Sequence, residues 1–329
     1  MRAPAAERRQ RRTYDGRMAR SVPVLAIAGY LGAGKTTLLN HLLRNSRGVR
    51  IGALVNDFGA VNIDAMLVAG QVDAMASLSN GCICCAVDDD ETAAMLGRLA
   101  TVKPALDLIV VEASGVAEPA ALARTLVMAD DKRFHYAGLV LVLDAVQPEL
   151  GHGLPAADLV VLNKASACPD VEGLLTRIRE LNPRVPVLRT DFARIDSALL
   201  VDPPASRVPQ AQLSFDELLH DAHDHDHPEH QSVEFRTDAA INPRMFMDFL
   251  QDRPAGLYRA KGFVDFGVQR FLVQLVGSSL RFEKHRKGAT ELVLIGTGME
   301  PAEVLAGLQG CAGAPADENA MLAVLKYVV

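Results

Sequence analysis

The sequence lacks any apolar run long enough to cross a membrane. A helix that spans a bilayer needs about 20 consecutive apolar residues, and no stretch of the 329-residue chain approaches that length. The chain also lacks an excess of positive charge. Its formal net charge is −6, whereas general nucleic-acid binders and proteins held on anionic membranes carry basic surfaces. We therefore expect a soluble globular protein with no membrane partner and no nucleic-acid partner.

The N-terminal segment lacks the apolar core of a secretion signal. Residues 1–20 contain seven arginines against only two acidic residues, Glu7 and Asp15. We interpret this segment as a basic disordered leader, or as sequence upstream of a true start at Met18. An arm that binds nucleic acid and a transit segment are the alternatives.

Cysteines are few and unevenly placed. Three of the five, Cys82, Cys84 and Cys85, fall within four residues, which is too close for the disulfide framework of a secreted protein. A reducing cytoplasm fits better, with the three thiolates of an irregular loop binding Zn²⁺ or another soft cation. Packing as small hydrophobes and redox chemistry of Cys82 with Cys85 are the alternatives. We expect the isolated Cys168 and Cys311 to pack as small apolar residues.

The chain does contain a glycine-rich loop between an apolar run and a helix-like stretch. Residues Gly29–Thr37 follow Val22–Ala28 and lead into Leu38–Leu43. This order predicts a phosphate-binding loop, because backbone N–H groups must curl around phosphates where a Cβ would obstruct them. Lys35 then reaches the β- and γ-phosphates, and Thr36 offers its hydroxyl to Mg²⁺. The nucleotide-binding residues predicted here are Gly29, Gly32, Ala33, Gly34, Lys35, Thr36 and Thr37.

Apolar runs recur along the first two hundred residues and predict the fold class. They are nearly continuous, which is typical of strands buried on both faces of a parallel sheet. The runs are Val22–Ala28, Arg50–Val55, Leu106–Val111, Gly138–Leu143, Asp158–Leu162 and Pro186–Leu188. We predict an α/β P-loop NTPase domain over residues 21–205, with a mainly parallel sheet flanked by helices.

Two acidic residues follow strands of this predicted sheet. Asp57 lies within Asn56–Gly59 and Glu112 begins Glu112–Gly115. Ligands of such sheets bind at the carboxyl ends of the strands, so both carboxylates would contact Mg²⁺ directly or through water. Gly115 would bring its backbone N–H to the γ-phosphate, which makes its loop a candidate switch. A plain turn residue is the alternative for Asp57. The predicted catalytic residues are Lys35, Thr36, Asp57 and Glu112.

The segment Asn163–Ser166 occupies the position where guanine-nucleotide proteins carry Asn-Lys-x-Asp. We predict that Asn163 orients the loop and that the stem of Lys164 covers the base. Ser166 stands where the base-reading aspartate belongs, and loss of that charge-assisted pair costs about 1–3 kcal/mol of preference for guanine. Asp170 replaces it only if the loop bends, so the choice between GTP and ATP stays open.

A composition change separates this domain from the C-terminal third. Residues 206–231 hold five of the nine histidines, among alternating aspartates, and we predict an exposed linker with weak auxiliary affinity for metal. A plain solvated linker is the alternative. The auxiliary ligands are His220, His223, His225, His227 and His230. Residues 232–329 predict a smaller α+β domain, in which the charged stretch Arg281–Lys287 reads as a solvated face without chemistry.

Together these motifs resemble the CobW-type metallochaperone GTPases, relatives of the urease and hydrogenase maturation GTPases. The resemblance rests on the phosphate loop, Asn56–Gly59, Gly81–Cys85 and Glu112–Gly115, together with Arg259–Gly262 in the C-terminal domain. Two departures are Ser166 and the shorter acid at position 57.

The resemblance implies a slow GTPase that carries Zn²⁺, or Co²⁺ or another divalent metal, to a client metalloenzyme. Its cofactors would be GTP and Mg²⁺, with Cys82, Cys84 and Cys85 holding the cargo metal. Metal affinity would depend on the nucleotide state, and a homodimer is one possible assembly. The alternatives are an ATP-using P-loop kinase or ligase with structural cysteines, and a non-enzymatic metal buffer or regulator.

Overall fold

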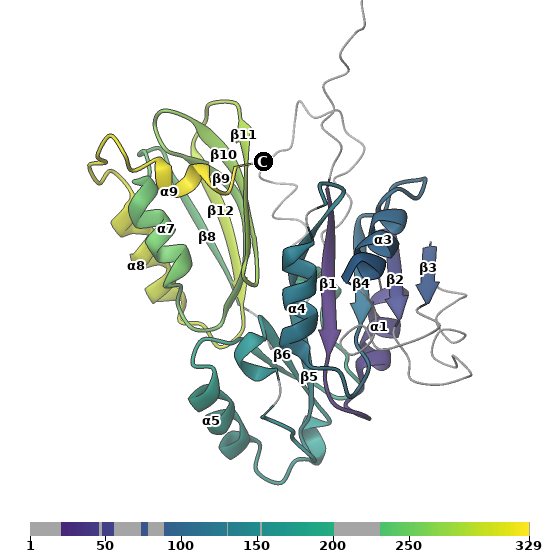
Figure 1. Ribbon diagram of the computed structural model, residues 1–329. Coiled ribbons are helices and arrows are strands. Elements are labelled where there is room, and N and C mark those ends of the chain that lie inside the picture. The colour runs from purple at the N-terminus through teal and green to yellow at the C-terminus, as the bar shows by residue number, and fades with distance from the viewer. Residues whose placement is uncertain are drawn as a thin grey trace, which may run out of the picture.

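The computed structural model describes residues 21–45, 48–55, 74–77, 89–129, 131–151, 153–200 and 231–328. Within these ranges the chain forms two β-sheets, each with its own helices (Figure 1). None of the helices in the described ranges is long and apolar enough to span a bilayer. The predicted domain boundaries, after residues 20, 205 and 231, stay predictions.

The first sheet is parallel and has seven strands in the order β3-β2-β4-β1-β5-β6-β7. Its strands are β1 Val22–Ala28, β2 Ile51–Val55, β3 Ala74–Ser77, β4 Leu108–Glu112, β5 Phe134–Asp144, β6 Leu159–Asn163 and β7 Val187–Arg189. The central strands β2, β4 and β6 are buried at every residue, as the continuous apolar runs predicted. The predicted P-loop α/β architecture is therefore confirmed.

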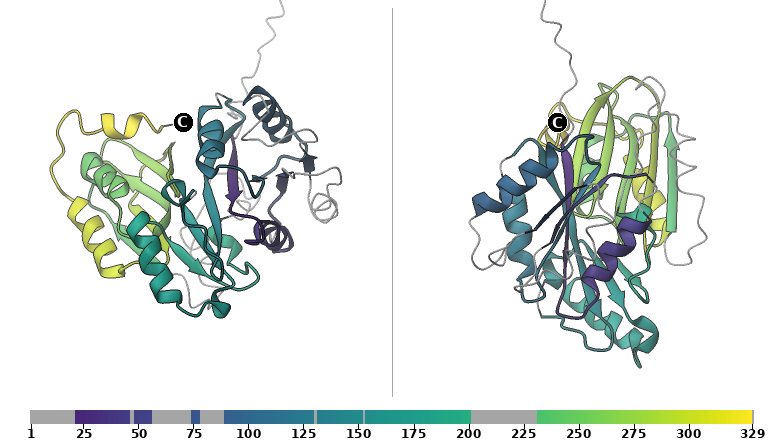
Figure 2. Two further views of the ribbon diagram at one scale, coloured as in Figure 1. Left: turned by 60° about the horizontal axis from the view of Figure 1, so that its bottom comes forward. Right: turned by 90° about the vertical axis from the view of Figure 1, so that its right-hand side faces the viewer.

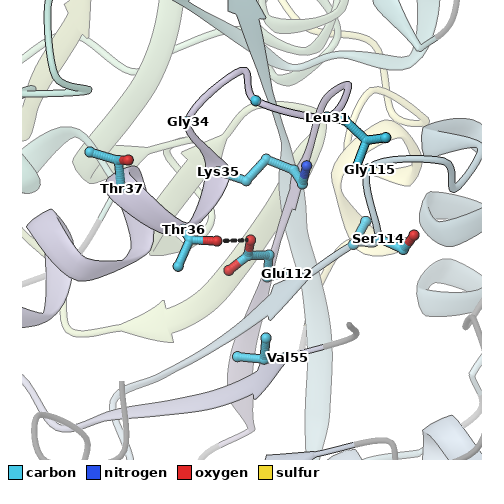
Figure 3. A pocket seen from close by; sticks show the side chains of 11 residues that line it. Leu31, Gly34, Lys35, Thr36, Thr37, Val55, Glu112, Ser114 and Gly115 are labelled. Carbon is cyan, nitrogen blue, oxygen red and sulfur yellow. Dashed lines mark hydrogen bonds between the residues drawn. The ribbon is translucent and has the colours of Figure 1, made fainter. Parts of the chain in front are cut away.

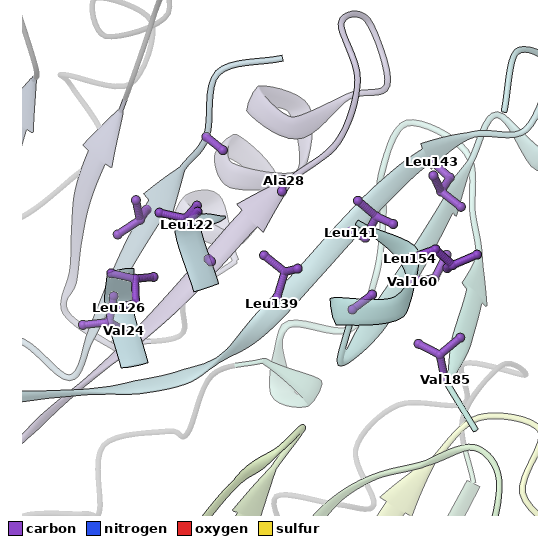
Figure 4. Packing of buried hydrophobic residues seen from close by; sticks show 14 of the residues in the cluster. Val24, Ala28, Leu122, Leu126, Leu139, Leu141, Leu143, Leu154, Val160 and Val185 are labelled. Atoms are coloured by element: carbon purple, nitrogen blue, oxygen red, sulfur yellow. The ribbon is translucent and has the colours of Figure 1, made fainter. Parts of the chain in front are cut away.

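Helices cover both faces of this sheet. They are α1 Lys35–Arg44, α3 Asp89–Ala100, α4 Pro119–Met128 and α5 Val171–Leu181, with short 3₁₀ turns η1 Leu154–Ala156, η2 Ala165–Ala167 and η3 Ser197–Leu199. Apolar side chains of α3, α4 and α5 pack on one face, where Leu122 and Leu126 of α4 meet Val24 and Leu139 (Figure 4). The other face packs against α1, through Leu38, Leu39 and Leu42.

The second sheet is antiparallel, with five strands in the order β11-β10-β9-β12-β8. Its strands are β8 Gln231–Thr237, β9 Leu257–Asp265, β10 Arg270–Val276, β11 Ser279–His285 and β12 Thr290–Gly296. The helices α7 Pro243–Gln251, α8 Pro301–Cys311 and α9 Leu322–Leu325 pack on one of its faces (Figure 1). The predicted smaller C-terminal α+β domain is therefore confirmed.

Strand β11 was missed by the sequence pattern, which indicated only a charged, solvated stretch at Arg281–Lys287. β11 is an edge strand, paired only with β10 among the described strands. Phe282 is fully buried and Leu280 packs against the same apolar cluster, while Glu283 on the opposite face is exposed. A strand covered on one face needs an apolar side chain only at alternate positions, and the surrounding charges hid that period.

The free face of the second sheet packs against the first domain (Figure 2). A register shift between Ile295 and Gly296 leaves Tyr258 as a bulge in β9, and bulges re-aim side chains. Tyr258 is 1% exposed and lies in the same apolar cluster as α1. The two domains thus share a buried contact.

A buried carboxylate, that of Asp158, also joins the domains. It is 8% exposed, and its Oδ2 accepts hydrogen bonds from Leu139 N at 2.8 Å and from Tyr136 Oη at 3.1 Å. Its Oδ1 accepts from Ser278 N of the second domain at 2.8 Å. Burial raises the pKa of Tyr136, and the charge of Asp158 adds to the rise, so the tyrosine remains a donor.

Replacement of Asp158 by alanine should destabilise the protein by about 2–4 kcal/mol, because it leaves several buried donors without an acceptor. Urea denaturation of the full chain, followed by circular dichroism, measures the change. The control is Glu172→Ala, which removes an exposed ion pair with Arg189 at 2.7 Å and should cost under about 1 kcal/mol. Equal stability of the two variants would contradict the assigned role of Asp158.

Candidate nucleotide site

A pocket of about 280 Å³ opens where β1, β2 and β4 end, beside the start of α1 (Figure 3). Parallel strands place all their carboxyl ends at one edge of the sheet, which is where such folds bind ligands. Its lining residues are Leu31, Gly32, Gly34, Lys35, Thr36, Thr37, Val55, Glu112, Ala113, Ser114 and Gly115. The pocket therefore brings together the predicted phosphate loop and the predicted switch loop.

The conformation of the phosphate loop requires glycine at two positions. Gly29 has φ +146°, and a Cβ there would lie 2.2 Å from the carbonyl oxygen of Val142. Gly34 has φ +109° and would place a Cβ 2.4 Å from Nδ2 of Asn163. Because Gly34 is also the N-cap of α1, no side chain caps the first N–H groups of that helix. These N–H groups and the positive end of the helix suit an anion such as phosphate.

Lys35 is the first residue of α1 and lies largely buried in the pocket wall. It is 8% exposed, and its Nζ donates to the carbonyl oxygen of Tyr30 at 3.2 Å. This contact keeps the ammonium group over the glycine-rich loop that it follows. A buried cation beside helix N–H groups that no side chain caps is an arrangement that binds polyanions.

Thr36 and Glu112 form the second chemical element of the pocket. The Thr36 hydroxyl donates to Oε1 of Glu112 at 2.6 Å, as Figure 3 shows, and Glu112 is 4% exposed. The pairing of Ile27 with Glu112 between β1 and β4 sets this approach. A hydroxyl and a carboxylate oxygen are the ligands that Mg²⁺ prefers, so the donor set fits a magnesium nucleotide.

The loop after β4 packs directly on the phosphate loop. A Cβ on Gly115 would lie 2.5 Å from Cδ2 of Leu31 and 3.0 Å from its backbone N, so the two loops approach closely here. Ser114 closes the turn by accepting from Val116 N at 3.3 Å. The predicted switch loop and the phosphate loop are therefore in contact at Leu31 and Gly115.

Asn163 and Lys164 lie at the end of β6, next to this pocket. Asn163 is 3% exposed; its Nδ2 donates to Ala33 O at 2.8 Å, and its Oδ1 accepts from Ala193 N at 2.9 Å. Lys164 Nζ lies 2.5 Å from Oδ2 of Asp144. Although burial raises the pKa of Asp144, the hydrogen bond from Lys164 and two backbone N–H groups hold it below its usual value.

Asp170, considered above as a substitute for the missing aspartate, is instead the N-cap residue of α5. Its Oδ1 accepts from Gly173 N at 2.9 Å and so caps the N-terminus of α5. The carboxylate beside Ser166 is that of Asp191, whose Oδ1 accepts from Ser166 N at 3.2 Å. Sequence reasoning missed Asp191, although its position two residues after the end of β7 was a usable signal.

Several predicted site residues lie outside the described ranges. They are Asp57, the cysteines Cys82, Cys84 and Cys85, and the histidines His220, His223, His225, His227 and His230. Within the described ranges, no three His, Cys, Asp or Glu side chains come together to hold a metal ion. Cys168 and Cys311 are described, and both pack against apolar clusters as predicted.

Comparisons with known proteins extend this picture along the chain. Residues 23–189 match the model of the CobW/HypB/UreG nucleotide-binding domain. Residues 230–312 match the C-terminal domain of the cobalamin synthesis protein CobW. These matches confirm the predicted P-loop nucleoside-triphosphatase class.

Two of the relatives below match over nearly their whole length, and the third over about half of it. The zinc chaperone YjiA of Escherichia coli is 27% identical over 88% of this chain and 98% of its own. The zinc chaperone CobW of a Sinorhizobium species is 30% identical over 87% of this chain and 96% of its own. The zinc-regulated GTPase metalloprotein activator 1 of Schizosaccharomyces pombe is 32% identical over 53% of this chain and 47% of its own. The chain therefore belongs to the CobW/HypB/UreG family and carries the CobW C-terminal domain as well.

Proposed function

We propose that this chain is a GTP-hydrolysing metal chaperone that binds Zn²⁺, or Co²⁺ or another divalent metal, and delivers it to a client metalloprotein. The observation that carries the proposal is the contact between Thr36 and Glu112 at 2.6 Å, inside a pocket lined by the phosphate loop. Two relatives aligned over most of this chain are named zinc chaperones, and one aligned over about half of it is named a zinc-regulated GTPase, which supports the same function here.

Different residues of the pocket would bind the phosphates and the Mg²⁺ of the nucleotide. The N–H groups at Gly32–Thr37 surround the phosphates, and the ammonium group of Lys35 offsets charge on the β- and γ-phosphates. Thr36, Glu112 and Asp57 would hold Mg²⁺, which draws negative charge from the phosphates when bound. Gly115 would donate its N–H to the γ-phosphate, so its loop senses whether that phosphate is present.

The cysteines follow strand β3 closely in the sequence. Strand β3 ends at Ser77, level with Val55 at the end of β2, and Cys82 follows five residues later. Three strand spacings separate β3 from β1, about 14 Å, while five extended residues span up to about 17 Å. The tether is therefore long enough for the thiolates to lie beside the phosphate loop.

A tether of this length would allow a link between nucleotide state and metal affinity. We propose that Cys82, Cys84 and Cys85 hold the cargo metal as thiolates, with the histidines of residues 206–231 as weak auxiliary ligands. Hydrolysis would release the switch loop at Gly115 and loosen the thiolate site, so the metal passes to the client. Such coupling must be reciprocal. Delivery in the cytoplasm fits the need for reduced thiols.

Replacement of Lys35 by alanine should lower GTP turnover by roughly a hundredfold or more, because it removes a preorganised cation from the phosphates. Phosphate release from the full chain, measured with GTP and Mg²⁺, checks this expectation. Lys132→Ala, an exposed lysine outside the pocket, is the control and should turn over like the native chain. Undiminished turnover by Lys35→Ala, with the fold intact, would contradict the assignment.

Replacement of Cys84 and Cys85 by serine should lower Zn²⁺ affinity by roughly a hundredfold or more, since a serine hydroxyl is a poor ligand for Zn²⁺. Competition against a chromogenic chelator measures the affinity. The control is Cys168→Ser, because that thiol packs against the first core and should contribute nothing to the metal. If the double variant binds as the native chain does, the clustered cysteines are packing residues.

A further inference from the structure

The loops that follow β6 and β7 are joined by three hydrogen bonds. Ala165 N donates to Thr190 O at 3.1 Å, Ser166 N donates to Oδ1 of Asp191 at 3.2 Å, and Ala193 N donates to Oδ1 of Asn163 at 2.9 Å. These two loops therefore form one rigid surface at the edge of the sheet that carries the phosphate pocket.

Backbone strain is concentrated in the same place. In the described part of the chain, the non-glycine residues with positive φ are Lys164 at 59°, Phe192 at 58° and Ala193 at 52°. Each such residue costs about 1–2 kcal/mol. The Thr190 hydroxyl helps to hold the strained turn by donating to Arg194 O at 2.6 Å. Strain that the surrounding contacts maintain is a mark of a functional site.

The turn displays an aromatic ring and a carboxylate. The Phe192 side chain is 72% exposed, and Cζ of Arg194 lies over one face of its ring, 5.5 Å from the ring centroid. Asp191 is half-buried, and in the described part of the chain its Oδ2 accepts no hydrogen bond. A ring with a free face and a carboxylate with free lone pairs can bind a flat, hydrogen-bonding ligand.

Guanine fits these groups, and adenine does not. The edge of guanine presents two donors, N1–H and the 2-amino group, which match the two oxygens of one carboxylate. Adenine presents an acceptor at N1, which a carboxylate repels. Ser166 supplies no charge at the usual position, but its N–H holds Oδ1 of Asp191 within 3.2 Å of its own backbone.

Two other nearby carboxylates already accept hydrogen bonds from neighbouring groups. Asp170 caps α5 through Gly173 N. Asp144 binds Lys164 through Oδ2 and accepts from Val146 N at 2.9 Å through Oδ1. Asp191 is therefore the acid beside Ser166 with acceptor capacity left for a base.

We infer that Asp191 is the specificity-determining residue for guanine in this chain, taking over from the missing aspartate at position 166, and that Phe192 is the platform on which the base stacks. The inference rests on the proposed nucleotide function and names the groups that select its base. The carboxylate that binds guanine would therefore come from the loop after β7 and not from the loop after β6. It would accept from the same two donors of the base, N1–H and the 2-amino group.

The test compares binding of GDP, ADP and xanthosine diphosphate to the full chain with Mg²⁺, by titration calorimetry. Asp191→Asn is the informative variant, because an asparagine oxygen still accepts from Ser166 N and leaves the loops joined. The native chain should prefer GDP to ADP by at least about a hundredfold. D191N should lower GDP affinity by roughly 10- to 100-fold, and it should raise affinity for xanthosine diphosphate because the amide now donates to the 2-oxo group.

A rescue variant separates base recognition from a structural role. Asp191→Ala combined with Ser166→Asp returns a carboxylate to the β6 loop and should restore preference for GDP over ADP. Asp170→Asn is the control, because it weakens the cap of α5 and should leave the ratio of GDP to ADP affinity unchanged.

The results that overturn the inference are specific. An unchanged ratio of GDP to ADP affinity in D191N overturns it, and so does a ratio that moves in D170N instead. In both cases the proposed nucleotide function stands. A native chain that binds neither nucleotide overturns the proposed function and this inference together.

Phe192→Ala tests the stacking platform separately. Stacking is tolerant of the base, so this variant should weaken GDP and ADP by a similar factor, roughly 5- to 100-fold, without changing their ratio. Val268→Ala, a residue of equal 72% exposure in the second domain, should have no effect on either nucleotide. If F192A binds both nucleotides as the native chain does, the ring is not a platform.

Discussion

One buried amide, the side chain of Asn163, holds together the loops on which the nucleotide site depends. It joins the phosphate loop through Ala33 O and the β7 loop through Ala193 N, at 2.8 and 2.9 Å. Each buried partner left unsatisfied would cost about 1–3 kcal/mol. The same amide explains why position 34 needs glycine, since a Cβ there would lie 2.4 Å from Nδ2. The phosphate end and the base end of the site are therefore one structural unit.

The segment after β7 extends this unit to the second domain. Ile195 O accepts from Nε2 of His41 at 2.6 Å, and Ser197 Oγ donates to Asn45 O at 2.9 Å, so the segment follows α1 to its end. Arg259 of β9 is 6% exposed; burial lowers its pKa to about 10, and the Asp196 carboxylate opposes that change. Arg259 thus stays charged at neutral pH. A movement of α1 on nucleotide binding would reach the C-terminal sheet through these contacts.

The parts of the site that follow from local sequence could be predicted. A strand, a glycine-rich loop and a helix are consecutive in the chain, so Gly29–Thr37 was located directly, and Glu112 followed from its place at a strand end. Asp191 was missed because it meets Ser166 across 25 residues. Asp170 was considered for its nearness in sequence, which does not show that it caps a helix. The edge strand β11 was hidden for a similar reason, since only its pairing with β10 shows which side chains face inward.

The central claim is that the phosphate pocket and the cysteine loop are energetically linked. The contact of Leu31 with Gly115 and the short tether from Ser77 to Cys82 support this link. The most direct test titrates Zn²⁺ into the full chain bound to GDP and to a non-hydrolysable GTP analogue. The account predicts tighter Zn²⁺ binding with the analogue, by at least about fivefold, and the same factor when nucleotide is titrated with and without Zn²⁺. Equal Zn²⁺ affinity in the two nucleotide states would contradict it.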